Sequence, residues 1–213
     1  MAGLLAEVEL QVMLAEDPEP PPATGGDAPR RALRRVASGV TVLTIEDDGL
    51  RHGATVSAIV AISRDPLMLG VCLRVSSSFT TMVERRRFFS VNVLAAGQAR
   101  VATRFATPGR RPGDAQFAGL RWTTDRLTGA PLIGGCLAYM ACRVTGSQRV
   151  GDHDLIIADV IGGATESGTP LLSFAGRLHN EEAAGPVRTG RYAEIPPDHP
   201  DRVRPTPQRS EVQ

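Results

Sequence analysis

The chain of 213 residues has few aromatic side chains and little net charge. Aromatic residues make up only 4% of it, so a core must be built mainly from Val, Ile, Leu and Ala. The formal net charge of +1 argues against nucleic acid or an anionic membrane as an electrostatic partner. The sequence has no apolar run near the ~20 residues of a membrane helix and no basic start of a secretory signal. We therefore expect a cytoplasmic protein.

Cysteine is also scarce. Cys72, Cys136 and Cys142 form no C-x-x-C pair and leave one thiol over, so they make no disulfide framework. Free thiols suit a reducing cytosol. The four histidines do not stand at metal-ligand spacing with these cysteines, and we expect no metal.

Proline-rich composition divides the chain. Residues 18–26 read PEPPPATGG, which cannot hold a regular helix or strand and separates a short N-terminal piece from the rest. The C-terminal end is rich in Pro, Arg and Asp and poor in apolar residues, as tails often are. The sequence thus predicts an N-terminal extension over residues 1–29, one domain over 30–180 and a tail over 181–213.

Within the central domain, β-type segments alternate with turns. The β-branched residues 40–46 precede Asp47-Asp48-Gly49, which predicts a hairpin. A short helix is expected from Asp27 as N-cap, through Val36, to a stop at Gly39. Further strands are expected at 66–73, 88–94, 137–145, 155–161 and 169–174, and helices at 80–87 and 98–107. This order favours a closed or split antiparallel barrel, and no G-x-G-x-x-G supports a Rossmann fold.

The first polar cluster is HGATVSA, residues 52–58. In a strand, Thr55 and Ser57 lie on one face and can offer hydroxyl groups to a ligand, while Val56 lies on the other. An ordinary half-exposed strand has the same pattern.

The second cluster is CLRVSSSF, residues 72–79, directly before an expected helix. Serines at a strand-to-helix junction can present hydroxyl and backbone N–H groups to a phosphate. Alternatively, Ser78 only caps the helix.

The third cluster is GDHD, residues 151–154, between two β-rich segments. It has the composition of a polar hairpin turn. Its histidine can also lie beside a planar ring and donate a hydrogen bond.

Taken in order and spacing, these clusters resemble the flavin reductase-like family, the short-chain reductase components of two-component flavin monooxygenases. The resemblance spans about residues 30–180. It also includes the segments SGVTVLT at 38–44, DPL at 65–67, FFSVNVL at 88–94 and RFA at 104–106.

This resemblance implies a mainly β, antiparallel split β-barrel of the FMN-binding type, with Greek-key connections and a few short helices. It further implies a homodimer with flavin sites near the subunit interface. The implied activity is reduction of FMN or FAD by NADH or NADPH, with release of the reduced flavin to a partner monooxygenase component. Hydride transfer between stacked rings needs positioning rather than a general base.

The resemblance also implies roles for individual residues. Thr55 to Ala58 line the flavin, Ser77 and Ser78 hold its phosphate, and His153 positions the nicotinamide as the one catalytic residue. The full set of expected cofactor-binding residues is Thr55, Val56, Ser57, Ala58, Cys72, Ser77, Ser78, Phe79, Arg104, Phe105, Gly151, Asp152 and His153.

Several positions depart from the family pattern. Ala58 and Phe79 replace hydroxyl or amide residues, Leu178 replaces an aromatic, and the loop 108–115 is longer and carries Arg110 and Arg111.

Two other functions are compatible with the same barrel: an oxidase-like protein with tightly held FMN, and a catalytically silent binding protein. The G-D-H turn argues against the oxidase-like protein, because a nicotinamide site implies reduction by NAD(P)H.

Overall fold

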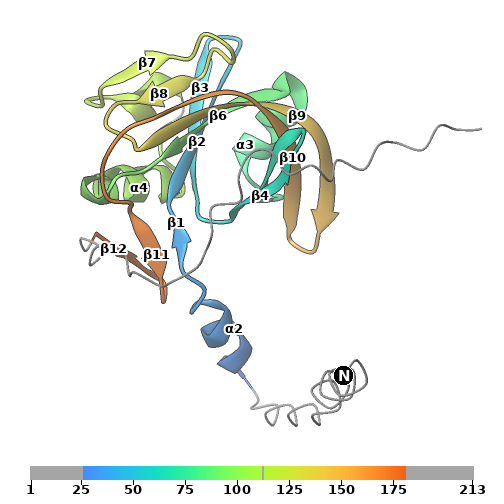
Figure 1. The fold of residues 1–213 in the computed structure, drawn as a ribbon, viewed down its shortest axis with the longest axis vertical. Coiled ribbons are helices and arrows are strands. Elements are labelled where there is room, and N and C mark those ends of the chain that lie inside the picture. The colour runs from blue at the N-terminus through green and yellow to red at the C-terminus, as the bar shows by residue number, and fades with distance from the viewer. Residues whose placement is uncertain (1–25, 112, 181–213) are drawn as a thin grey trace, which may run out of the picture. The chain divides into compact units, whose positions relative to one another are not determined.

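The computed structural model describes residues 26–111 and 113–180 (Figure 1). The predictions for residues 1–25 of the extension and for the tail at 181–213 lie outside this range. None of the described helices is long and apolar enough to cross a membrane.

The largest element of the described fold is one antiparallel sheet of seven strands in the order β3-β2-β6-β9-β10-β5-β4. The strands are β2 (Thr41–Asp47), β3 (Leu50–Val56), β4 (Ile59–Arg64), β5 (Leu67–Arg74), β6 (Phe88–Val93), β9 (Ala138–Val150) and β10 (His153–Thr165). The antiparallel, mainly β architecture expected from the sequence is confirmed.

Smaller elements complete the described fold. Short strands are β1 (Ser38–Gly39), β7 (Trp122–Thr124), β8 (Pro131–Ile133), β11 (Leu172–Phe174) and β12 (Arg177–His179). Helices are α2 (Ala28–Leu33), α3 (Ser78–Arg86) and α4 (Ala99–Ala106), with 3-10 turns η1 (Ala96–Gln98) and η2 (Gly113–Phe117).

Two tight hairpins set the register of the sheet. Asp47 pairs with Leu50 across a turn in which Asp48 and Gly49 have φ of 52° and 78°, as the D-D-G segment predicts. Val150 pairs with His153 across Gly151-Asp152, which starts the long β9–β10 ribbon (Figure 1). The exposed polar residues at the end of β9 are held in this ribbon by backbone pairing, so the strand runs past the expected end at residue 145.

The sheet curls, because its two edge strands, β3 and β4, are joined by Ser57 and Ala58 alone. The N–H of Cys72, in β5, donates to the carbonyl of Ala58, just after β3, at 3.0 Å. Because β3 and β4 are the opposite edges of the strand order, their direct connection requires the sheet to curl into a split barrel. The bond from Cys72 extends the β4–β5 ladder, in which Ile59 pairs with Val71, to Ala58. It also brings the first two polar clusters together.

The core is aliphatic, as the composition requires, with four fully buried phenylalanines added. One cluster fills the barrel and includes Phe79 and Phe89, whose rings meet edge to face at 6.2 Å. A second cluster lies under α4 and includes Phe105 and Phe117, with ring centroids 5.2 Å apart. These clusters fix α3 and α4 against the sheet, and both helices border the candidate site described below.

Four local predictions need correction. The first helix ends at Leu33 rather than running through Val36, and it buries no residue that could stabilise a longer helix. Asp27 precedes it, but its side chain makes no capping bond. Ser38-Gly39 pairs with β11 as a strand instead of stopping a helix, and β11 begins at Leu172 rather than at residue 169.

Candidate functional site

A cavity of about 730 Å³ lies where β3, β5, α3, α4 and β10 come together. Its walls include nine of the residues expected from the sequence: Thr55, Val56, Ser57, Ala58, Cys72, Ser77, Ser78, Phe105 and His153. All three polar clusters therefore contribute to one hollow, although they are far apart in the chain.

The β3 wall has two hydroxyl groups, one hydrogen-bonded within the protein and one without a protein partner in the described structure. Thr55 Oγ1 donates at 2.7 Å to the carbonyl of Ala102 and so ties β3 to α4. Ser57 lies one residue beyond the end of β3, is exposed, and lines the same cavity as Thr55. Only Ser57 of this pair has its hydroxyl hydrogen available to a ligand in this arrangement.

The serine wall lies at the start of α3. Ser77, not Ser78, is the N-cap, because its hydroxyl accepts from the N–H of Phe79 at 3.3 Å. Ser78 is thereby left to face the cavity, with its Oγ 3.2 Å from His52 Nε2. The positive end of the α3 dipole and these hydroxyls favour an anion at this wall.

The third wall begins at the tight β9–β10 turn. His153 pairs with Arg74 of β5 in the sheet register, and both residues line the cavity. His153 Nδ1 lies 2.8 Å from Asp152 Oδ1, and this hydrogen bond is the main cause that lowers the pKa of the Asp152 carboxyl. G-D-H is therefore both a turn and part of the cavity wall.

Four of the expected residues do not line the cavity. Phe79 is fully buried in the barrel core, and Gly151 and Asp152 form the turn behind His153. Arg104 points instead to the 113–118 segment, where it donates to the carbonyl of Ala118 at 2.8 Å. Their positions make Arg104 a support of that segment and Phe79 part of the core.

Among the cavity residues that were not expected, His52 and Arg110 carry polar side chains that contact each other. His52 lies 6.2 Å from Phe79 ring to ring, and Arg110 reaches it from the loop after α4. Burial and then the charge of Arg110 lower the pKa of His52 to about 4, so its ring is neutral at ordinary pH. His52 stood inside the first cluster and Arg110 in the unusual loop, but the sequence carries nothing that pairs them.

Comparison with known proteins agrees with this geometry. The sequence-family model of the flavin reductase like domain matches residues 33–182. The chain belongs to the flavin reductase-like family. Its recognition from the ordered clusters is thereby confirmed.

Individual members of the family extend the comparison. The chain is 41% identical over 163 residues to an NADPH-flavin oxidoreductase of Streptomyces viridifaciens, covering 76% of this chain and 84% of that protein. It is 33% identical to the reductase component of a 4-nitrophenol monooxygenase of Rhodococcus opacus, covering 70% and 77%. It superposes on the NADH:FAD oxidoreductase SgcE6 of Streptomyces globisporus, solved with NAD and FAD fragments, with a TM-score of 0.69, 26% identity and coverage of 74% and 93%.

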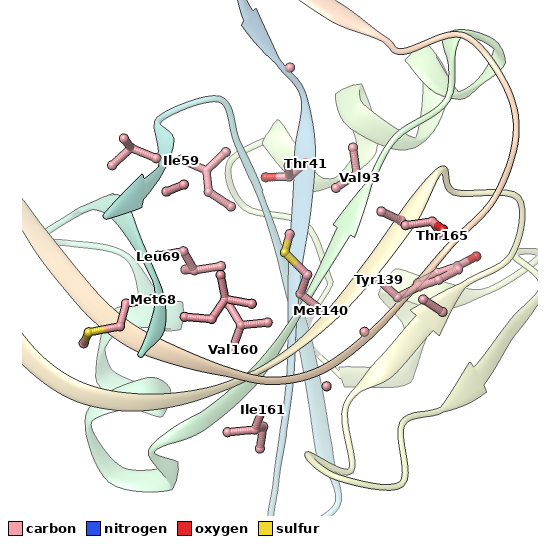
Figure 2. Close-up of a pocket in the computed structure, with 18 residues that line it drawn as sticks. Thr41, Ile59, Met68, Leu69, Val93, Tyr139, Met140, Val160, Ile161 and Thr165 are labelled. Carbon is pink, nitrogen blue, oxygen red and sulfur yellow. The ribbon is translucent and has the colours of Figure 1, made fainter. Parts of the chain in front are cut away.

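A second hollow, of about 770 Å³, is almost wholly apolar (Figure 2). Leu69, Met140 and Val160 lie together within it. Two of its three side-chain hydroxyl groups are already used: Thr41 donates to the carbonyl of Val56 and Tyr139 to that of Ile133, both at 2.8 Å. This apolar groove offers packing surface rather than ligand hydrogen bonds.

Proposed function

We propose that the protein is an NAD(P)H:flavin oxidoreductase that reduces FMN or FAD and releases the reduced flavin to a partner monooxygenase component. The observation that carries this proposal is the single cavity into which all three polar clusters converge. Membership of the flavin reductase-like family supports it.

The residues of the cavity fit the chemical parts of a flavin. Ser78 and the start of α3 suit the phosphate, because both present donors to an anion. Val56, Ala58 and Phe105 provide apolar surface for a planar ring system, and the exposed Ser57 a hydroxyl for its polar edge. His153 is placed to contact the nicotinamide.

In this function the protein acts by binding and orienting. The reduced nicotinamide supplies a hydride to the flavin when both are bound. The Nδ1–H of His153 donates to Asp152, which fixes the ring and leaves Nε2 as the ring nitrogen that can contact the nicotinamide. Binding both partners in one cavity replaces a bimolecular encounter by an oriented contact.

A steady-state assay tests this function directly. We expect oxidation of NADH or NADPH only when FMN, FAD or riboflavin is added, with oxygen as the final acceptor in the absence of a partner. The rate is followed for each nicotinamide and flavin pair. Tightly held FMN without NAD(P)H oxidation would favour the flavin-carrying alternative, and no flavin interaction at all would favour the silent binding protein.

Replacing His153 with Ala should raise the KM for the nicotinamide and lower kcat while flavin affinity changes little. One positioning contact is worth about 1–2 kcal/mol, or roughly tenfold in kcat/KM. Asp152→Asn is the control, because an amide oxygen can still accept from His153 and the rates should stay near those of the wild type. If His153→Ala weakens flavin binding to the same extent, the turn is structural and the assigned role is wrong.

We further propose that the protein is a homodimer that packs through the apolar groove. Val60, Leu67 and Ile161 line this groove and are 57%, 51% and 37% exposed in the single chain, an arrangement typical of an interaction surface. Ile59 of the groove directly follows Ala58 of the cavity, so a second copy seated there comes close to the flavin site.

The remaining assignments are proposals of the same kind. Residues 30–180 form the reductase domain, which the family match over 33–182 supports. A cytoplasmic location is supported by the three free cysteines and by the reduced nicotinamide that the reaction needs.

A further inference from the structure

A polar network lies behind Ser78 and has no part in the function proposed so far. It joins His52 of β3, Gln116 of η2 and Arg110 of the loop after α4. Gln116 is 3% exposed, so its amide depends on protein partners for its hydrogen bonds. The network therefore determines where each hydrogen lies.

The orientation of the Gln116 amide follows from its neighbours. Its Oε1 lies 3.2 Å from the backbone N–H of Gly53 and 3.1 Å from Nε of Arg110, both of which can only donate. Exchanging the oxygen and nitrogen of the amide would set an NH₂ group against two donors. Gln116 Nε2 must therefore face His52 Nδ1, at 2.9 Å, and donate to it.

The tautomer of His52 follows in turn. Because Nδ1 accepts from Gln116, the single ring proton of a neutral imidazole must lie on Nε2. Arg110 Nη2, 3.3 Å from Nε2, can also only donate, so both ring nitrogens face a donor. The contact from Gln116 is the shorter, at 2.9 Å, and its amide is held in place by two further bonds, whereas Arg110 Nη2 also donates to the carbonyl of Gly53. We therefore assign Nδ1 as the acceptor. The only charged group with a contact to the ring in the described structure is Arg110, and its charge and the burial of the ring oppose a second proton.

We propose that the Nε2–H of His52 donates to Ser78 Oγ, 3.2 Å away, and so turns the hydroxyl hydrogen of Ser78 into the cavity toward the flavin phosphate. A hydroxyl that accepts one hydrogen bond donates in another direction, and the two bonds strengthen each other. His52 is thus a positioning residue, and Gln116 fixes its tautomer. This inference rests on the phosphate site of the proposed function.

The consequence is selectivity for phosphorylated flavins. FMN and FAD carry the phosphate, whereas riboflavin lacks it. His52 should therefore affect the affinity for FMN and leave the affinity for riboflavin unchanged, because it acts only through Ser78.

A double-mutant cycle on flavin binding tests this inference. We expect His52→Leu to weaken FMN binding about three- to tenfold, because the Ser78 hydroxyl is then no longer held in one orientation. Riboflavin binding should weaken less than about twofold. On a Ser78→Ala background the same change should have no effect on FMN. His52→Gln, whose amide nitrogen can replace Nε2 as donor, should restore most of the affinity. His179→Gln, at a histidine outside the cavity, is the matched control.

The ring itself provides a second measurement on the unaltered protein. Nitrogen-15 chemical shifts of the histidine side chains should show His52 with its proton on Nε2, unchanged between about pH 5.5 and 8. A proton on Nδ1, or titration of His52 within this range, would overturn the inference.

The two proposals fail in different ways. If the wild type neither binds nor reduces FMN or FAD, the proposed function is wrong. If the wild type reduces FMN but His52→Leu weakens FMN and riboflavin alike, or acts equally without the Ser78 hydroxyl, the function stands and the role of His52 is rejected.

Discussion

Replacing both Ser77 and Ser78 with Ala should weaken FMN binding on the order of a hundredfold and leave riboflavin binding nearly unchanged. Hydrogen bonds to a charged acceptor contribute about 1.5–3 kcal/mol each, and two such bonds are removed from the phosphate. Riboflavin has no phosphate and so does not use them. Calorimetric titration of both flavins into the wild type and the double variant measures the contrast.

The cap formed by Ser77 requires a separate control, because its hydroxyl accepts from the N–H of Phe79. Its loss costs about 1 kcal/mol of fold stability and could weaken both ligands together. Ser77→Asp keeps a capping oxygen but adds a negative charge beside the phosphate. We expect this variant to retain the wild-type Tm, to lose FMN affinity and to keep riboflavin affinity. Equal losses of affinity for the two flavins would indicate that the phosphate binds elsewhere, for example at Arg110.

Replacing Val60 with Asp should convert the proposed homodimer into a folded monomer. Val60 lines the apolar groove and is 57% exposed in the single chain, so a carboxylate there costs the monomer little. In a symmetric dimer each copy would bury an unpaired charge, at several kcal/mol per ion. The dimer dissociation constant should therefore rise about a thousandfold or more. Sedimentation velocity over a range of protein concentrations measures the change.

Val150→Asp is the matched control, because Val150 is 58% exposed but lies outside the groove. We expect this variant to remain a dimer, and both variants to keep the far-ultraviolet circular dichroism of the wild type. A wild type that is monomeric at micromolar concentration, or a Val60→Asp variant that still dimerises, would reject the groove as the subunit interface.

Features that depend on neighbouring residues could be read from the sequence. The D-D-G turn determines the β2–β3 hairpin, because two adjacent residues with positive φ need little support from the rest of the fold. The order of the polar clusters was likewise sufficient for the family, and through it for the barrel. The bounds of the first helix could not be predicted, because α2 buries no side chain and its end depends on the pairing of Ser38-Gly39 with β11.

The tertiary structure decided how the residues of the site cooperate. It made Ser77 the cap and left Ser78 facing the cavity, and it buried Phe79 in the core. His52 and Arg110 come from segments 58 positions apart, and only the packing of β3 against α4 and the loop after it brings them into contact. Turns and strand patterns arise from interactions within a few residues, so the sequence determines them directly. The cavity, and the proposed tautomer of His52 beside it, depend on bonds between distant segments. These bonds form only when the barrel has folded.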